Sequence, residues 1–303
     1  MSLPPVEGSV TMITGASSGI GRAAAREFAR AGARVVLASR NEARLRDLAA
    51  EISAFPATSA LPRGPAAPLV VPADVTRDDD VQALVDRTLE RFGRLDILIC
   101  NAGVGLYSPV KDLPDDAVRR VFEVNFHGVL RCVQRSLPSM LERGSGLIQI
   151  VSSILGRRSV PGYAGYCATK FALGGLADAL RVEVARAGVR VQMIYPGLTA
   201  TEFSQNSILR DASRGGPAPV TGGPGATEGT APRATLPGIG RTGLLGPMPA
   251  EAVARRMLGA ARSGRRDTVI TVSGRALLLL DSLSPSLTDW ILGRVMTPRG
   301  AGV

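Results

Sequence analysis

Short apolar runs alternate with amphipathic helical patterns over the first two thirds of the chain. The apolar runs are rich in β-branched residues and predict strands at residues 9–14, 34–38, 69–71, 95–100, 147–151 and 189–195. Helical periodicity between them predicts helices at residues 19–31, 42–53, 78–92, 114–142 and 163–187. Because the strands are apolar almost throughout, we expect a parallel sheet with helices on both faces. Right-handed crossovers then give an α/β fold with a doubly wound sheet of about seven strands.

Two segments interrupt this alternation. Residues 54–68 contain several prolines and predict a surface loop. Residues 205–247 are rich in Gly, Pro, Ser and Thr, and a connection of this length is typical of a functional lid or of a disordered segment. The sequence alone leaves open which of the two it is.

Beyond residue 247 the chain returns to regular patterns, with a helix expected at 249–263 and a strand at 268–272. We therefore predict one domain over residues 1–273, with 205–247 as its substrate loop, and a C-terminal extension over residues 274–303. The extension combines apolar residues with several arginines. Such a segment more often packs on its own domain or on another subunit, and contact with an anionic membrane surface is the alternative.

The net charge of the 303-residue chain is +10. A basic balance of this size can reflect an anionic partner, such as nucleic acid, a membrane surface or a phosphate-bearing cofactor. However, Lys111 and Lys170 are the only lysines, and the many arginines accompany abundant Ala, Gly and Pro. This pattern favours a coding bias, so we predict no nucleic-acid partner. In such a chain, Lys170 hints that its position needs an amine.

Cysteine and histidine usage narrows the chemistry further. The three cysteines are odd in number and lack CxxC spacing, which argues against a disulfide framework or a zinc site and for a reducing compartment. They are Cys100, Cys132 and Cys167. His127 is the only histidine, so we predict no metal site. Pro4, Pro5 and Glu7 stand where a signal peptide would need an apolar run, and the expected location is therefore cytoplasmic.

A glycine-rich turn follows the first predicted strand and opens the first predicted helix. Residues 14–21 read Thr-Gly-Ala-Ser-Ser-Gly-Ile-Gly. Glycines at such a turn let backbone N–H groups approach a pyrophosphate, and the helix N-terminus adds a partial positive charge. The same residues also match the hydrolase pattern G-x-S-x-G with Ser17 as the nucleophile. A triad would then need a later acid followed by a histidine, and because only His127 is available we reject a hydrolase.

The end of the second predicted strand indicates which dinucleotide is preferred. Sites that bind NAD place an Asp or Glu near this point for the ribose 2′-hydroxyl, whereas an Arg suits a 2′-phosphate. The residues here are Ser39 and Arg40, with no acid at the strand end. We therefore predict NADP(H) as the preferred cofactor and NAD(H) as the alternative.

Tyr166 and Lys170 are four residues apart and share one face of a predicted helix. A free phenol with a pKa near 10 is a poor base at neutral pH. A positive charge about 5 Å away, at an effective dielectric near 20, favours the phenolate by about 3 kcal/mol. We therefore expect Lys170 to lower the pKa of Tyr166, so that the pair serves as general acid or base for a carbonyl/alcohol couple. A Tyr and a Lys four residues apart often occur by chance. The pair becomes informative because it lies early in the helix that follows the fifth predicted strand.

Polar residues close two further predicted strands. Ser152 and Ser153 end the fifth strand, and Asn101-Ala102-Gly103 follows the fourth. Open α/β sheets bind ligands at the carboxyl ends of their strands, so these residues should lie at one edge. A serine there can bind a substrate oxygen or simply cap a turn. Asn125 lies within a predicted long helix, an unfavourable place for Asn unless its amide is used.

Taken in order, these features resemble the classical short-chain dehydrogenases/reductases, a family of Rossmann-like enzymes. The resemblance covers about residues 8–203, and the predicted helix and strand at 249–272 also fit it. It rests on residues 14–21, Asp74, Asn101-Ala102-Gly103, Asn125, Ser153, Tyr166, Lys170 and Pro196-Gly197.

The resemblance implies catalytic roles for four residues. Tyr166 would be the acid/base, and Lys170 would lower its pKa and bind the nicotinamide ribose. Ser153, which fits the family spacing better than Ser152, would orient the substrate. Asn125 would hold a water that connects Lys170 to bulk solvent. Family members usually pair through the helices that carry Asn125 and Tyr166, which implies a homodimer or homotetramer.

The resemblance also implies a cofactor-binding set along the carboxyl edge of the sheet. The glycine turn would hold the pyrophosphate, Asp74 and Val75 the adenine, residues 101–103 the adenosine side, and residues 196–201 the carboxamide. The predicted residues are Gly15, Ser17, Ser18, Gly19, Ile20, Gly21, Ser39, Arg40, Asp74, Val75, Asn101, Ala102, Gly103, Tyr166, Lys170, Pro196, Gly197, Thr199 and Thr201.

The segments that would define the substrate depart from the family pattern. The loop at 205–247 is longer and richer in Gly and Pro than is common, the extension from residue 274 is additional, and Tyr195 stands where Asn or Ser is frequent. The large loop and the apolar extension favour an apolar carbonyl or alcohol substrate. A non-catalytic NADP(H)-binding sensor on the same fold is the alternative function, although a sensor would not need the four implied catalytic residues together.

Overall fold

The fold is described by a computed structural model for residues 4–56, 66–204, 208–209 and 246–296. Most of the predicted loop at 205–247 therefore lies outside the described residues, as does the end of the extension, residues 297–303.

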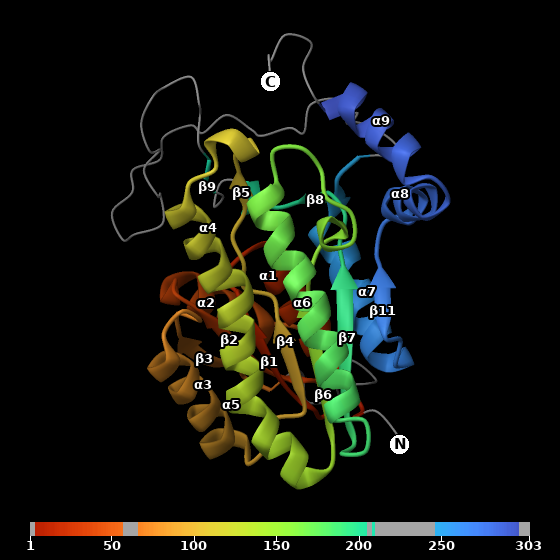
Figure 1. The fold of residues 1–303 in the computed structure, drawn as a ribbon. Helices are drawn as coiled ribbons and strands as arrows, with labels where there is room; N and C mark the ends of the chain where they lie inside the picture. Colours follow the sequence, from red (N-terminus) through yellow and green to blue (C-terminus); the bar gives the residue numbers. More distant parts are fainter. Residues whose placement is uncertain (1–3, 57–65, 205–207, 210–245, 297–303) are drawn as a thin grey trace.

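A seven-stranded parallel sheet forms the centre of the molecule, in the order β11-β7-β6-β4-β1-β2-β3. From β1 the chain winds outward to β3, returns to β4 beside β1, and winds outward the other way to β11 (Figure 1). This confirms the predicted doubly wound α/β sheet and all of its predicted strands. The strands are β1 (Val10–Thr14), β2 (Arg34–Ser39), β3 (Leu69–Pro72), β4 (Ile97–Cys100), β6 (Gly146–Val151), β7 (Val189–Tyr195) and β11 (Asp267–Val269).

Helices cover both faces because neighbouring strand residues point to opposite sides of the sheet. Leu98 of β4 lies in the hydrophobic core beneath α3 (Asp78–Phe92), α5 (Gly128–Arg143) and α6 (Ala164–Glu183). Ile99, the next residue, lies in the opposite core beneath α1 (Gly19–Arg30), α2 (Glu42–Ser53) and α7 (Ala250–Ser263). The strands are apolar throughout because helices bury both faces of the sheet, as predicted.

The structure corrects the long helix predicted at 114–142. It consists of α4 (Asp115–Phe122), a π-helical turn η2 (Glu123–His127) and α5. Pro114 precedes α4 as its N-cap residue. The wider π turn carries Asn125 into the protein, where it is fully buried. π turns inside helices are frequent at functional sites.

The strand predicted at 268–272 is too long at its end. β11 stops at Val269, because the hydroxyl of Thr271 accepts a hydrogen bond of 3.1 Å from the Gly274 N–H and caps α8 (Val272–Leu283). The boundary that we predicted after residue 273 therefore falls in the first turn of α8. The extension continues with α9 (Pro285–Met296). In the described parts of the chain, no helix combines the length and apolar character needed to cross a membrane.

Two short parallel strand pairs lie at the carboxyl edge of the main sheet (Figure 1). β5 (Leu106–Tyr107) pairs with β9 (Ile208–Leu209), and β8 (Thr199–Ala200) pairs with β10 (Met248–Pro249). These pairs fix the beginning and the end of the segment predicted as the substrate loop. Both ends of that loop thus lie beside the carboxyl edge.

Asp96 links β1 and β4 at the opposite, amino edge of the sheet. Its buried carboxylate accepts a hydrogen bond of 2.8 Å from the Val10 N–H and forms ion pairs with Arg94 at 2.7 Å and Arg143 at 3.3 Å. The guanidinium groups are partly exposed, so the buried N–H of Val10 is the partner that depends most on the carboxylate.

Replacement of Asp96 by Ala should therefore lower the free energy of unfolding by about 1–3 kcal/mol, the usual cost of leaving a buried donor unpaired. Denaturant unfolding would measure the change. Asp47, which is exposed on α2, supplies the matched control, and Asp47→Ala should have almost no effect. Equal losses for the two variants would contradict this role of Asp96.

Candidate active site

Most of the predicted site residues gather at the carboxyl edge of the sheet, directly after β1, β2, β3, β4, β6 and β7 (Figure 1). The edge faces the two short strand pairs and the start of α6. The parallel topology thus brings together segments that are far apart in the sequence.

The glycine turn after β1 packs tightly against the end of β4. Gly15 has a φ of +67°, and a Cβ there would lie 2.9 Å from the Cα of Ala102. A Cβ on Gly21 would lie 2.2 Å from the carbonyl oxygen of Gly15. Both positions therefore require glycine. Residues 17–20, between them, remain partly accessible to solvent, as a phosphate-binding turn must.

Thr14 and Asn101 hold this turn in place. The Thr14 hydroxyl accepts hydrogen bonds from the N–H groups of Asn101 at 3.0 Å and Ala102 at 3.1 Å. In return, the Asn101 amide donates to the carbonyl oxygens of Thr14 at 3.0 Å and Gly15 at 3.3 Å. Asn101 is thus engaged in shaping the site. The positioning role of Thr14 was not predicted, because it depends on contact between β1 and β4.

Ser39 and Arg40 lie at the end of β2 as predicted. The Ser39 hydroxyl accepts a hydrogen bond of 3.3 Å from the N–H of Asn41, whose own side chain caps α2. Arg40 is exposed, and none of the ion pairs found in the described part of the chain involves it. Arg44, one turn further on, instead pairs with Glu202 at 2.6 Å. Arg40 is therefore available to an anion at this strand end.

Asp74 and Val75 follow β3. The Asp74 carboxylate accepts hydrogen bonds from the N–H of Thr76 at 2.9 Å and from its hydroxyl at 2.8 Å, which closes a tight turn. Val75 is buried against Gly128, where an added Cβ would lie 2.7 Å from the valine side chain. The turn thus fixes both residues at the outer part of the carboxyl edge.

Tyr166 and Lys170 lie on one face of α6, and both are buried. The Lys170 Nζ is 5.7 Å from the centroid of the Tyr166 ring and donates a hydrogen bond of 3.1 Å to the carbonyl oxygen of Val151, at the end of β6. Ser153 lies close enough to the phenol to act on its pKa, which it lowers. The structure therefore brings together three of the four predicted catalytic residues.

Burial sets the protonation of both groups. It raises the pKa of Tyr166 above its usual value, and only Ser153 acts in the opposite direction. Burial also lowers the pKa of Lys170 to about 8. Desolvation of the phenolate is the largest influence on the pKa of Tyr166 in this structure, and the expected depression of that pKa by Lys170 stays a prediction. The phenol is therefore protonated at neutral pH.

The two adjacent serines have different surroundings. The Ser152 hydroxyl is buried and donates a hydrogen bond of 3.1 Å to the carbonyl oxygen of Lys170. The Ser153 hydroxyl is partly exposed, accepts a hydrogen bond of 3.1 Å from the Leu155 N–H, and caps the short helix η3 (Ile154–Gly156). Ser153 is thus the serine that can reach a ligand, as the family spacing implied.

Asn125 connects the π turn to the segment after β4 and to α6. Its amide nitrogen donates to the Val104 carbonyl oxygen at 2.9 Å and to the Thr169 hydroxyl at 3.1 Å, and its oxygen accepts from the Val104 N–H at 2.8 Å. This confirms that the amide of this helical Asn is used. Thr169 and Val104 were not predicted, since no spacing in the sequence links them to Asn125.

Residues 196–201 cover the glycine turn. The carbonyl oxygen of Pro196 accepts a hydrogen bond of 2.8 Å from the Ile154 N–H, next to Ser153. The Thr199 hydroxyl donates to the Gly197 carbonyl oxygen at 3.0 Å. A Cβ on Gly19 would lie 3.1 Å from the Thr201 side chain. The segment after β7 therefore reaches from the serine segment to the glycine turn, and its role as a carboxamide site stays a prediction.

Several aromatic residues lie near Tyr166. Phe203, in the short helix η4 (Glu202–Ser204), meets the Tyr166 ring edge to face with 5.7 Å between ring centroids. Tyr107 of β5 and Tyr163 form a similar pair at 5.1 Å. Phe203 was not predicted as a site residue, because only the path of the chain after β8 brings it to Tyr166.

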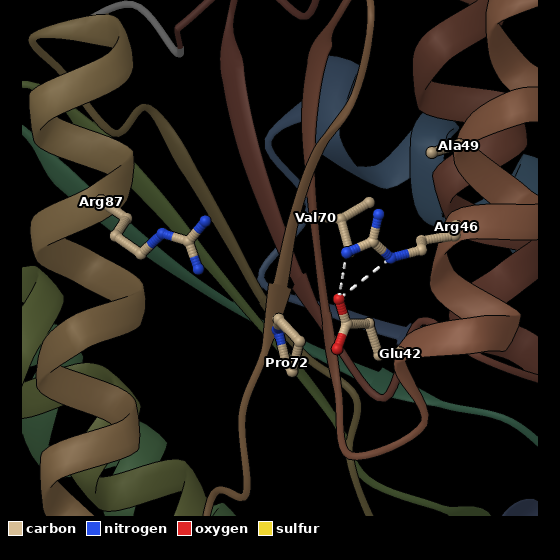
Figure 2. A pocket seen from close by; sticks show the side chains of 6 residues that line it. All are labelled: Glu42, Arg46, Ala49, Val70, Pro72 and Arg87. Carbon is tan, nitrogen blue, oxygen red and sulfur yellow. Dashed lines mark hydrogen bonds and ion pairs between the residues drawn. The ribbon is translucent and has the colours of Figure 1, made fainter.

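A separate hollow lies between α2, β3 and α3, at the far edge of the sheet. Figure 2 shows Glu42 and Arg46 paired on α2, with Arg87 on the other side of the strand. The residues that line it are Glu42, Arg46, Ala49, Val70, Pro72 and Arg87. None of them is a predicted site residue, so the hollow is distinct from the carboxyl-edge site.

Comparison with known proteins agrees with this geometry. The family model described as short chain dehydrogenase matches residues 9–211. A dehydrogenase/reductase SDR family protein 7-like of Drosophila melanogaster is 32% identical over 288 residues, which are 95% of this chain and 80% of that protein. Dehydrogenase/reductase SDR family member 7B of Danio rerio is 35% identical over 70% of this chain and 68% of its own length.

Solved structures show the same fold. A short chain dehydrogenase/reductase from Burkholderia phymatum in complex with NAD is 28% identical, with a TM-score of 0.74 over 94% of this chain and 96% of its own. An alcohol dehydrogenase from Thermococcus sibiricus complexed with 5-hydroxy-NADP is 26% identical, with a TM-score of 0.67 over 88% of this chain and 97% of its own. On the family match and the identity to its relatives, the chain belongs to the short-chain dehydrogenase/reductase family of oxidoreductases.

Proposed function

We propose that this protein interconverts a carbonyl and an alcohol with NADP(H), and that Tyr166 moves the proton. The observation that carries the proposal is the position of the buried Tyr166 phenol beside Ser153, with the Lys170 Nζ 5.7 Å from the centroid of its ring. A protonated phenol beside a second hydroxyl suits a general acid that donates to a carbonyl oxygen.

The residues of the carboxyl edge fit a dinucleotide. The glycine turn leaves no room for side chains, and residues 17–20 present their backbone at the start of α1. This turn would hold the pyrophosphate, Arg40 a 2′-phosphate, and residues 196–201 the carboxamide. When bound, the nicotinamide supplies or accepts the hydride. The relatives that were solved with NAD and with 5-hydroxy-NADP support a nicotinamide cofactor.

In the reduction direction, the Ser153 hydroxyl binds the substrate oxygen and the Tyr166 phenol donates its proton to that oxygen. Lys170 stabilises the negative charge that develops on the phenol, and its hydrogen bond to Val151 holds the ammonium in place. In the oxidation direction the same groups remove the proton from the alcohol.

A proton path from Lys170 is supported by the space beside Gly103. A Cβ on this glycine would lie 3.2 Å from the Asn125 oxygen and 3.6 Å from the Lys170 Nζ, so both polar atoms border the same small volume. We propose that a water there relays protons to the lysine. A side chain at position 103 would occupy that volume.

The substrate that we propose is apolar. Phe203 and the Tyr107–Tyr163 pair lie beside the catalytic phenol, and the described ends of the loop at 205–247 run next to them through β9 and β10. Aromatic faces of this kind favour a flat or hydrophobic carbonyl compound over a highly polar one.

We further propose that two copies of the chain pair through α6 and the helices α4 and α5, giving a homodimer or homotetramer. Phe171 and Val182 on α6 are exposed in the single chain, which supports a contact on this helix.

Replacement of Tyr166 by Phe should lower turnover of NADPH with a reducible ketone by at least about a thousandfold, because the proton donor is lost. Binding of NADPH, followed by its fluorescence, should change little. Tyr163→Phe is the matched control, since Tyr163 lies three residues away and has no proposed proton role. Turnover that survives in Tyr166→Phe would disprove the assignment. NADPH binding without turnover on any of a broad set of carbonyls and alcohols, in the unaltered protein, would favour the sensor.

Replacement of Arg40 by Ala should weaken NADPH binding by about tenfold, the loss of one charge-assisted hydrogen bond, and should leave NADH binding nearly unchanged. Fluorescence titration with both dinucleotides gives the ratio. Arg34→Ala, at the other end of the same strand, is the control. An equal loss of affinity for NADPH and NADH would show that Arg40 does not bind the 2′-phosphate.

Lys170 should leave a signature in the pH dependence of stability. Its pKa is about 8 in the folded protein against 10.5 as the ordinary value, so between these pH values the unfolded chain binds more protons. The contribution of this site to the free energy of unfolding therefore rises with pH across that window, by at most about 3 kcal/mol.

The stability difference between the natural protein and Lys170→Met should accordingly shift in favour of the natural protein between about pH 7 and about pH 10. Denaturant unfolding at several pH values measures this difference. The exposed Lys111 gives the control, since Lys111→Met should show no such trend. If the difference in free energy of unfolding between the natural protein and Lys170→Met did not change with pH, the lysine would remain charged in the folded protein.

A further inference from the structure

The C-terminal helices α8 and α9 are joined at Ser284 and contact each other, and we call this pair of helices the hairpin. The start of α8 packs on the catalytic segment, because a Cβ on Gly274 would lie 3.1 Å from the Cδ1 of Ile154. Arg158, which follows η3, forms ion pairs with Asp281 of α8 at 3.2 Å and with Asp289 of α9. The hairpin is therefore fixed to the body of the protein beside Ser153.

Although it is anchored, the hairpin leaves large apolar side chains exposed. On α8, Val272, Leu279 and Leu283 are 58%, 61% and 75% exposed, and their spacing of seven and four residues places them on one face. On α9, Leu287 and Trp290 are 45% and 55% exposed, three residues apart. We call these five residues the hairpin patch. Apolar exposure concentrated in this way marks a contact surface.

The hairpin and Arg158, which binds it, together carry a net positive charge. The charged residues of the hairpin are Arg275, Asp281, Asp289 and Arg294. Both acids are paired with Arg158, while Asp289 and the two arginines are exposed. The Arg294 guanidinium lies over the Trp290 ring at 4.4 Å from its centroid. Leucines beside a tryptophan and arginines are the composition of helices that lie in the interface of an anionic bilayer.

The hairpin patch lies at the same end of the molecule as the catalytic residues. β11 is parallel to β7, so α8 starts from the carboxyl edge, and Figure 1 shows both helices beside that edge. A surface that held the hairpin would therefore lie next to the opening of the active site.

We propose that the hairpin patch docks on an anionic membrane surface, with α8 and α9 lying in the plane of the interface. The leucines and Trp290 enter the boundary between headgroups and acyl chains, and Arg275 and Arg294 meet the lipid phosphates. Docking brings the active site next to the lipid phase, from which an apolar substrate can be taken.

A second copy of the chain fits the patch less well. In a symmetric contact the same patch serves both copies, so the arginines of the two copies would be brought into one interface. Arg158 binds both acids of the hairpin, and the three arginines and two acids together leave a net charge of +1. An anionic lipid surface supplies the missing negative charge.

Trp290 provides a direct probe because it is the only tryptophan of the chain. Its emission should shift to shorter wavelength and be quenched by brominated acyl chains when the full-length protein meets vesicles of phosphatidylcholine with phosphatidylglycerol. Vesicles of phosphatidylcholine alone should have little effect, and added salt should weaken the response. Unchanged emission with the anionic vesicles would overturn the proposal.

A variant with Leu279→Ser and Leu283→Ser keeps the tryptophan and should partition about tenfold less to the anionic vesicles in a sedimentation assay. Leu141→Ser is the matched control, because this exposed leucine lies near the end of α5, at the amino edge of the sheet. NADPH binding by the double variant verifies its fold. Equal partitioning of the double variant and the control would count against the patch.

The same probe identifies the competing occupant. A blue shift of the Trp290 emission that grows with protein concentration in the absence of lipid, together with a larger mass by light scattering, would assign the patch to contact between copies and would overturn membrane docking.

Discussion

The amide of Asn125 joins three parts of the protein that are distant in sequence, and the catalytic geometry depends on it. Its hydrogen bonds reach both backbone groups of Val104, after β4, and the hydroxyl of Thr169, on α6. Because Asn125 is fully buried, each of its polar groups left without a partner would lower the free energy of unfolding by about 1–3 kcal/mol. The π turn and α6 are therefore held in one arrangement, and with them Lys170, the neighbour of Thr169.

Burial rather than proximity determines the chemistry of the tyrosine and lysine. At 5.7 Å between Nζ and the ring centroid, Lys170 is close enough to Tyr166 to favour its anion, yet the pKa of the phenol is raised because the ring has lost its contact with water. The same loss of water lowers the pKa of the lysine. A buried phenol of this kind stays protonated at neutral pH until a proton acceptor approaches it. The nearby Ser153 hydroxyl can interact with the phenol both before and after it loses its proton.

A single short segment supports both the chemistry and the C-terminal hairpin. Ser153 caps η3, Ile154 packs under α8, and Arg158 pairs with both helices of the hairpin. Movement of the hairpin would therefore act on Ile154, one residue away from Ser153, the serine proposed to bind the substrate. The hairpin packs on its own domain, which the composition favoured. It still leaves its leucines exposed, and these support the proposed membrane contact.

The sequence by itself determined the order of strands and helices, since alternating apolar runs and helical periodicity are local properties. It also determined the glycine turn, because the close backbone approach at Gly15 and Gly21 needs glycine, and it named Tyr166 as the candidate proton donor. Tertiary structure alone decided how these parts meet. The π turn at Asn125, the hydroxyl of Thr14 that ties β1 to β4, and the approach of Phe203 to Tyr166 depend on contacts between segments. It also decided the pKa of Tyr166, because desolvation is a property of the packed site and not of the spacing between two residues.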